Sequence, residues 1–396
     1  MLLTLKENKF DPNVLVRTRT TRKQRKMKIH PFKASYPEQS LIPGIDSFLS
    51  KVKQNYREFA DNGFFNKDNT PSIFIYQIQG SFGKNHTAII ASAELEDYLN
   101  ENIVIHEHTI AEKEQQQMEL IVHRHSMVKP ILLCFDPIDQ FYQKMEKWMK
   151  ISELFFSVEL EDNTKHLFYK IEESSVVKEI QQYFENSIPR AYIADGHHRT
   201  AAASRLYNSY RNAPEEHPEI PTILSVFFPY DQLEVHDYNR VIEILNSISP
   251  TLLLAKLSKF CNITPLDVPA KPGKQWELTC YINREWYQLN WRRTEVLNKL
   301  KTEVENDYQL FNELILREIL EIEDVRSDRR IKYVAGPEGI QGVIDATQKN
   351  DLNVGFCLYP LSLSTMIKVA DQKATLPPKS TYFVPRIKNG LIVQEI

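Results

Sequence analysis

Glycine is scarce in this sequence, which has 11 glycines among 396 residues. Several nucleotide-binding folds cradle phosphates in glycine-rich loops, so this scarcity argues against an extended loop of that kind. Any anion site then has to use a short turn, a helix end or charged side chains. The segment 80–84 reads Gly-Ser-Phe-Gly-Lys, with two residues between its glycines where a phosphate loop has four. We therefore expect a hairpin turn there.

Cysteine and long apolar runs are also scarce. The four cysteines are far apart and form no C-x-x-C pair, which favours reduced thiols over a disulfide framework or a zinc knuckle. No run of about 18 apolar residues is present, so we expect no membrane span. The net charge of −3 gives no global field that attracts nucleic acid or an acidic membrane. We expect a cytoplasmic protein with a small-molecule substrate, and the sequence leaves its oligomeric state open.

Acidic residues are absent between Arg17 and Lys28, and this segment contains a cluster of lysines and arginines. No apolar core of about 7–15 residues follows them, as a secretory signal requires. A nucleic-acid arm is one interpretation of residues 1–27. We expect instead a basic, disordered extension that precedes a natural start at Met27, so that residues 1–26 need not belong to the native protein.

The chain length predicts two domains or three. Strand-like apolar runs alternate with helical periodicity, which predicts a mixed α/β (α+β) fold. Prolines accumulate over 249–275 and mark a soft boundary. We therefore divide the chain into a core over 28–248 and a smaller C-terminal α+β region over 249–396 that completes the site.

The patterns predict individual elements along this framework. Helices are expected over 45–60, 111–125, 138–149, 174–186, 199–211, 240–247 and most of 293–322, and a short acidic helix or a loop over 93–99. Strands are expected over 71–78, 87–91, 131–135, 190–194 and 222–228, with hairpins over 155–171 and 276–291. The remaining C-terminal part reads as strand and loop.

The segment from Tyr192 to Arg199 carries the clearest chemical signal. A short apolar strand ends at Asp195, Gly196 permits a tight turn, and a helix begins near Arg199. A helix N-terminus offers unpaired backbone N–H groups and partial positive charge, so it favours anions. Arg199 adds a planar donor fork, and His197 and His198 add donors that titrate near neutral pH. A plain strand-to-helix turn capped by Asp195 is the structural alternative.

A second segment places Glu107 between His106 and His108, directly after an apolar strand. Glu107 has the chemistry of a general base that deprotonates a hydroxyl as it attacks a phosphoryl group. A metal site of His106, His108, His123 and His125 is an alternative, although these histidines lack the spacing of a helical zinc site. An exposed polar loop is the structural alternative.

Two further segments carry charge and hydroxyl groups. Lys379, Ser380 and Thr381 follow a rigid pair of prolines and are expected to line a pocket for a phosphate or carboxylate, with a plain loop as the alternative. The cluster from Asp324 to Arg330 follows a helix and is interpreted as a solvated face rather than a ligand site.

Four motifs together resemble a bacterial family, the domain of unknown function 1015 family, from about residue 28 to the C-terminus. They are Pro31-Phe32, His106-Glu107, the segment Ala194 to Arg199, and the segment Pro377 to Phe383. The His-Glu segment, Lys129-Pro130-Ile131 and the Asp-Gly-His-His-Arg turn also resemble the ParB/sulfiredoxin superfamily, and within it the free-serine kinases.

This resemblance implies a ParB/sulfiredoxin-like core and a kinase-like site that uses ATP or ADP with Mg²⁺. It makes Glu107 the base, Asp195 and His198 catalytic helpers, and Gly196, His197, His198 and Arg199 the phosphate cradle. His106, Lys379, Ser380 and Thr381 are expected to bind substrate, and Asp195 is the expected metal ligand. The chain departs from the pattern at Gln115 to Gln117, where an arginine is expected, and at Asn239, where a histidine is expected.

The leading hypothesis from the sequence is a nucleotide-dependent small-molecule phosphotransferase, with serine as the acceptor that the resemblance implies. A non-catalytic nucleotide or phosphate sensor keeps the anion site without turnover. A phosphatase acting on a phosphorylated metabolite uses the same groups, and the sequence does not separate it from a kinase. A DNA-binding protein is disfavoured by the absence of a basic stripe beyond residues 17–28.

Overall fold

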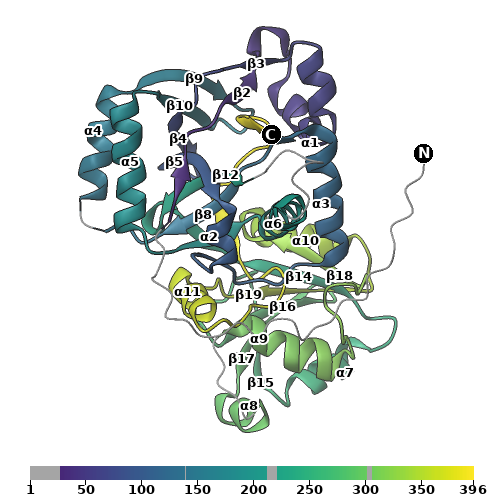
Figure 1. Ribbon diagram of the computed structural model, residues 1–396. Helices are drawn as coiled ribbons and strands as arrows, with labels where there is room; N and C mark the ends of the chain where they lie inside the picture. The colour runs from purple at the N-terminus through teal and green to yellow at the C-terminus, as the bar shows by residue number, and fades with distance from the viewer. Residues whose placement is uncertain (1–26, 139, 212–220, 301–305) are drawn as a thin grey trace.

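The computed structural model describes residues 27–138, 140–211, 221–300 and 306–396 (Figure 1). Apart from Met27, the basic extension expected from the sequence lies outside the described residues. The chain forms a mixed α/β structure with several sheets. No helix in the described ranges is long and apolar enough to cross a membrane.

A nine-stranded mixed sheet dominates the N-terminal half. Its order is β6-β11-β8-β12-β5-β4-β10-β9, with β1 paired to β5. The strands are β1 (Ile29–His30), β4 (Ile73–Ser81), β5 (Lys84–Glu94), β6 (Ile103–Val104), β8 (Ile131–Phe135), β9 (Glu153–Glu159), β10 (Lys165–Ile171), β11 (Ala191–Asp195) and β12 (Thr222–Pro229). Every residue of β8 is buried, as expected for a short apolar run covered on both faces.

Helices cover both faces of this sheet (Figure 1). They are α1 (Ile45–Asp61), α2 (Leu95–Leu99), α3 (Ala111–Arg124), α4 (Phe141–Ile151), α5 (Ser174–Ser187) and α6 (His197–Arg211). Rings of α4 and α5 pack on β8 and β12, with Phe135 and Phe141 5.2 Å apart and Phe184 and Phe227 5.0 Å apart. The helices α3 and α6 lie on the opposite side in Figure 1.

A second, six-stranded antiparallel sheet has the order β15-β17-β16-β19-β14-β18. Its strands are β14 (Tyr238–Glu243), β15 (Cys261–Leu266), β16 (Glu277–Ile282), β17 (Glu285–Trp291), β18 (Ile331–Ala335) and β19 (Asn353–Leu358). The helices with it are α7 (Pro250–Leu257), α8 (Arg293–Leu300), α9 (Asp307–Leu310), a π-helix (Phe311–Ile319) and α10 (Gly339–Gln348). Asn283 and Arg284 both have positive φ at the β16–β17 turn, as a tight hairpin requires.

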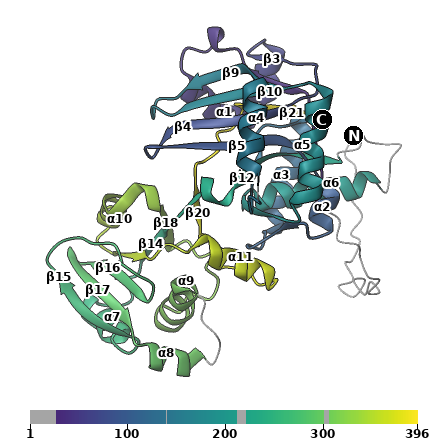
Figure 2. The same cartoon turned by 90° about the vertical axis from the view of Figure 1, so that its left-hand side faces the viewer.

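The C-terminal segment leaves the second sheet and returns to the first part of the chain (Figure 2). After α11 (Leu363–Asp371), β20 (Tyr382–Val384) pairs with β13 (Glu234–His236). The last strand, β21 (Val393–Glu395), lies in a four-stranded sheet between β2 (Ala34–Pro37) and β7 (Ser126–Met127), with β3 (Phe65–Lys67) beyond β2. Residues far apart in sequence are therefore brought together around 378–389.

The structure confirms most of the expected elements and corrects three. The hairpins over 155–171 and 276–291 and the turn at 80–84 are present. The helix expected over 240–247 is wrong: Tyr238–Glu243 is a strand, because its short apolar run pairs with β18 and β19 on both sides. The C-terminal part contains α10 and α11 in addition to strand and loop, and α6 begins at His197, two residues before Arg199.

The position of β14 bears on the expected domain division. This strand precedes residue 249 and yet lies inside the second sheet. The division into an extension over 1–27, a core over 28–248 and a C-terminal region over 249–396 stays a prediction.

Candidate active site

A cavity of about 580 Å³ collects the segments that the sequence singles out. The first sheet contributes the turn between β11 and α6, the segment 106–110 and one face of α3. The second sheet contributes Tyr238 and Tyr333, and the returning C-terminal segment contributes Lys379, Thr381 and Arg386. Parts of the chain on both sheets therefore form one site.

The turn between β11 and α6 depends on Gly196. Its φ is +117°, and a Cβ atom there would lie 2.9 Å from both Ile131 Cγ2 and Arg199 Nη2. The N–H of Thr200 donates to the Gly196 carbonyl at 2.9 Å, so the helix starts directly after the glycine. The first N–H groups of α6 have no partner within the helix, and this corner lines the cavity.

Two histidines at the start of α6 hold the segment that carries Glu107. The backbone N–H of His106 donates to His197 Nε2 at 3.4 Å, and the N–H of Ile110 donates to His198 Nε2 at 3.2 Å. Burial lowers the pKa of both imidazoles, which suits neutral rings that accept these hydrogen bonds. Both residues line the cavity, and their ring nitrogens connect 106–110 to the helix corner.

His106 connects this segment to the C-terminal loop. Its side chain is 2% exposed, and Nε2 lies 3.3 Å from the Thr381 hydroxyl oxygen. Burial lowers the pKa of His106 to about 4, so the ring is neutral at physiological pH. His106 and Thr381 both line the cavity, where they join β6 to the segment before β20.

Asp195 lies within a group of cations. Its Oδ2 accepts from Arg199 Nη2 at 2.9 Å and lies 3.2 Å from Lys129 Nζ. Burial raises the pKa of Asp195, but Arg199, Lys129 and Arg386 outweigh it and hold the pKa well below its usual range. The carboxylate is therefore charged and serves to gather three cations at the wall of the cavity.

The expected Mg²⁺ does not fit this arrangement around Asp195. A dication at its carboxylate would face Lys129, Arg199 and Arg386 at close range, which costs electrostatic energy in a partly buried site. The described residues also contain no group of three histidine, cysteine or acidic side chains that could hold a metal ion, so the alternative histidine site is not assembled either.

Glu107 is the other carboxylate of the cavity and its surroundings differ. Burial raises the pKa of Glu107, and the nearby cations Lys379, Arg326 and Lys113 offset only part of that shift. No described residue makes a hydrogen bond or ion pair with its side chain. A half-buried carboxylate without a partner and with a raised pKa is free to accept a proton from a ligand.

A buried arginine holds the C-terminal loop in place. Arg240 is 1% exposed and donates to the carbonyls of Tyr238, Pro378 and Lys379, at 2.8, 3.2 and 2.9 Å. Its guanidinium also lies over the rings of Tyr308 and Tyr333. The loop thereby presents Lys379, with φ at +57°, to the cavity.

Ser380 does not share the surroundings of its neighbours. Its side chain is buried, and its hydroxyl donates to the Pro377 carbonyl at 2.7 Å. The cavity lining includes Lys379 and Thr381 but not Ser380. The hydroxyl of Ser380 therefore stabilises the turn and does not line the cavity with its neighbours.

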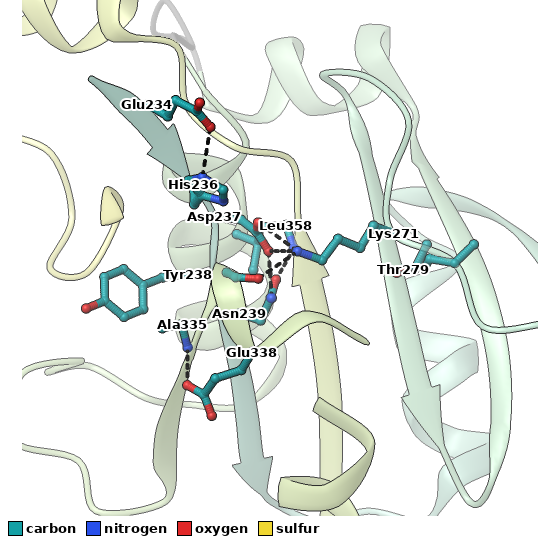
Figure 3. A network of polar contacts seen from close by, with 12 residues as sticks. Glu234, His236, Asp237, Tyr238, Asn239, Lys271, Thr279, Ala335, Glu338 and Leu358 are labelled. Atoms are coloured by element: carbon teal, nitrogen blue, oxygen red, sulfur yellow. Dashed lines mark hydrogen bonds and ion pairs between the residues drawn. The ribbon is translucent and has the colours of Figure 1, made fainter. Parts of the chain in front are cut away.

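A polar network fixes the start of β14 beside the cavity (Figure 3). Lys271 Nζ lies 2.9 and 3.1 Å from the two carboxylate oxygens of Asp237, which is 3% exposed. Asn239 donates to Asp237 at 2.6 Å and accepts from the Leu358 N–H at 3.1 Å. Asn239, at the position where the resemblance implies a histidine, therefore has a structural role. It anchors the strand that carries Tyr238.

Several cavity residues were not foreseen from the sequence. Lys129 meets Asp195 because β8, which follows it, lies beside β11. Arg386 acts on Asp195 because the C-terminal segment returns to the first sheet. The helical spacing of Lys113, Gln117 and Arg124 was a usable signal, since it puts one face of α3 along the cavity. Within the charged cluster 324–330, Arg326 lines the cavity, whereas Arg330 pairs with Asp328 at 2.7 Å.

The sequence model of a family described as "Protein of unknown function (DUF1015)" matches residues 20–314. The match ends before Arg326 and Lys379 of the cavity. No curated protein matches the sequence.

The solved structures to which this chain is similar are distant. SbnI with a C-terminal truncation from Staphylococcus aureus is 10% identical, with a TM-score of 0.41 over 76% of this chain and 85% of that one. A free serine kinase in complex with AMP is 12% identical, with a TM-score of 0.37 over 77% and 92%. A conserved hypothetical protein from Pyrococcus furiosus is 13% identical, with a TM-score of 0.37 over 78% and 95%.

Proposed function

The chain belongs to the DUF1015 family, and from the chemistry of its cavity we propose that it is a nucleotide-dependent phosphotransferase acting on a small hydroxyl compound. One observation carries the proposal: an unpaired carboxylate, Glu107, lines the same cavity as a helix start surrounded by cations. In this proposal the first sheet and its helices are a ParB/sulfiredoxin-like core, as the sequence motifs imply.

The phosphate side of the site is the corner from Gly196 to Arg199. Backbone N–H groups at the start of α6 favour an anion, and the absence of a side chain at Gly196 leaves room for Ile131 and Arg199 beside the turn. Lys129 and Arg199 already stand at this corner because Asp195 pairs with both. Together with Arg386 they would neutralise the phosphates of ATP or ADP.

Glu107 is the proposed base. It takes the proton of the acceptor hydroxyl, whose oxygen forms a bond to the terminal phosphorus of the nucleotide. The bridging P–O bond breaks, and its electron pair stays on the departing nucleotide phosphate. A raised pKa brings the carboxylate closer to the basicity that proton transfer at neutral pH requires.

The other residues first expected to be catalytic have positioning roles in this proposal. His198 holds Ile110 through an accepted hydrogen bond, and His197 holds His106, so both fix the segment that carries Glu107. Asp195 organises cations. No step is routed through a metal ion, because the cations around Asp195 do not suit one.

Calorimetry with ATP and ADP, followed by transfer assays with a labelled terminal phosphate, tests the proposal. We expect nucleotide binding in the wild type, and loss of transfer with retained binding in Glu107→Gln. Glu119→Gln, an exposed change on α3 outside the cavity, is the matched control and should keep both. Binding without transfer to any acceptor would favour the sensor, and release of phosphate from a phosphorylated metabolite would favour the phosphatase. Absence of nucleotide binding would contradict the proposal.

A further inference from the structure

The charge balance of the cavity is strongly one-sided. Its lining holds eight lysines and arginines against two acidic residues, Glu107 and Asp195, within the described part of the chain. Proteins recognise an ammonium group best through carboxylates and aromatic faces. Whether the acceptor substrate can carry an ammonium group therefore depends on the free carboxylates and aromatic faces of the cavity.

Neither carboxylate is available to an ammonium group. Asp195 is already paired with Lys129 at 3.2 Å and with Arg199 at 2.9 Å. In the proposed reaction Glu107 faces the acceptor hydroxyl as its base. The neutral amides that remain in the lining compensate a buried ammonium less well than a carboxylate does.

Each of the two tyrosine rings of the cavity already has a cation of the protein against it. Lys379 Nζ lies 5.3 Å from the centroid of the Tyr238 ring, and the Arg240 guanidinium lies 4.7 Å from that of Tyr333. Both tyrosines line the cavity. The protein's own cations therefore already occupy one face of each of these two rings.

Three cations near Glu107 form no ion pair within the described part of the chain. Lys113, Arg326 and Lys379 all act electrostatically on the Glu107 carboxylate and line the cavity. No described residue makes an ion pair with any of them, in contrast to Lys129 and Arg199. They stand at the end of the cavity where the acceptor hydroxyl has to lie, so they are placed to bind an anionic group of the acceptor.

We infer that the acceptor is a hydroxyl compound that carries a carboxylate or phosphate and no ammonium group. This inference rests on the proposed phosphotransferase function. It narrows the substrate class to hydroxy acids and phosphorylated alcohols, and it departs from the amino acid that the sequence resemblance implies.

The test compares acceptors that differ in one group. Glycerate and serine both carry a terminal hydroxyl and a carboxylate, but serine has an ammonium group where glycerate has a second hydroxyl. Glycerol is neutral. Glycerol 3-phosphate is an anion that carries a phosphate and no carboxylate. Transfer rates from labelled ATP and ADP, and thermal shifts of the nucleotide-loaded full chain, are measured for all four. We expect glycerate or glycerol 3-phosphate to react and bind, and to exceed serine and glycerol by about ten-fold or more in kcat/KM.

A matched pair of variants locates the effect. Arg326→Gln removes a cation of the cavity, and Arg329→Gln removes an exposed arginine three residues away that lies outside it. For the anionic acceptor, Arg326→Gln should raise KM about ten-fold or more, while the nucleotide Kd stays unchanged. Arg329→Gln should change neither.

The outcomes separate the inference from the function on which it rests. Serine reacting as well as glycerate, or the anionic probes showing no advantage in rate or thermal shift, overturns the acceptor class while nucleotide binding can still stand. A failure of nucleotides to bind removes the phosphotransferase itself. A preference for glycerate over glycerol 3-phosphate identifies a carboxylate, and the reverse identifies a phosphate.

Discussion

The guanidinium of Arg240 donates to the backbone carbonyl of Lys379 at 2.9 Å, so a fully buried cation fixes the loop that presents an exposed one to the cavity. The two residues are 139 apart in sequence. The arginine lies on a strand of the second sheet and the lysine in the returning C-terminal segment. The relationship joins the stability of the second sheet to the shape of the site.

Replacing Arg240 should therefore affect folding and ligand binding together. Arg240→Ala leaves the carbonyls of Pro378 and Lys379 without their donor, and a hydrogen bond to a charged group is worth about 1.5–3 kcal/mol. We expect a loss of that order in the free energy of unfolding, measured by urea titration, and a partial loss in Arg240→Lys, which cannot reproduce the planar fork. Arg329→Ala, at an exposed position, should change stability by less than about 0.5 kcal/mol.

Arg199 should contribute to phosphate binding. Arg199→Ala removes a charged donor beside the α6 corner, at an expected cost of about 1.5–3 kcal/mol, or one to two decades in nucleotide affinity. Calorimetry with ADP measures it. Arg205→Ala is the control on the same helix, because Arg205 pairs with Glu114 in a surface ion pair. Equal losses in the two variants would show that overall charge, and not the corner, binds the nucleotide.

Gly196→Ala should disrupt the corner through contact as well as through backbone conformation. Its Cβ would lie 2.9 Å from Ile131 Cγ2, within a packed interior. Gly63→Ala is the matched control, since Gly63 has φ at +80° and no atom within 4 Å of a Cβ. We expect about 1–2 kcal/mol of destabilisation at Gly63 from the left-handed backbone alone and a larger loss at Gly196, measured by denaturant unfolding. Equal losses would remove the steric explanation.

Glu107 links activity to stability through its raised pKa. Between the ordinary carboxyl pKa and the raised one, the folded state binds more protons than the unfolded state, so stability falls as pH rises through that window. Glu107→Gln does not titrate there. We expect this variant to be more stable than the wild type at pH 7 and equally stable below the ordinary carboxyl pKa. The transfer rate of the wild type should fall as pH decreases through the raised pKa. A variant less stable than the wild type at pH 7 would contradict the role of burial.

His106 should make the protein sensitive to mild acid. Its pKa is lowered to about 4 by burial, so between about 6.5 and 4 the unfolded state binds more protons and stability falls as pH decreases. The slope from one such group is at most about 1.4 kcal/mol per pH unit. Urea unfolding at several pH values should show a smaller slope in His106→Gln than in the wild type. His123→Gln, an exposed change on α3, should leave the slope unchanged.

What the sequence predicted correctly is mostly local. The turn between β11 and α6 follows from a short apolar strand, a glycine and a helix start within eight residues, and the structure places this turn in the cavity with Glu107. The helix expected over 240–247 was wrong because a short apolar run fits a strand or a buried helix equally well. Pairing with two strands from later in the chain decided between them.

The rest of the site depends on long-range assembly. Lys129 looks like an ordinary lysine before a proline, and it lies near Asp195 because β8 pairs with β11, a strand that comes later in the chain. Arg386 joins them only through the return of the C-terminal segment. Ser380 stands between two cavity residues, but the turn directs its hydroxyl to a carbonyl. His197 and His198 were expected to contact phosphate, but in the structure they accept hydrogen bonds from backbone N–H groups of the segment 106–110. The sequence could not predict these bonds, because it does not reveal which segments lie side by side.

The return of the chain also orders events during synthesis. The strand β21 pairs with β2 and β7, which were made hundreds of residues earlier, and the cavity wall at Lys379, Thr381 and Arg386 lies just before it. While these residues are still inside the ribosome, the nascent chain cannot complete the wall of its own cavity. Partial translation products that end before Lys379 therefore lack this wall of the cavity.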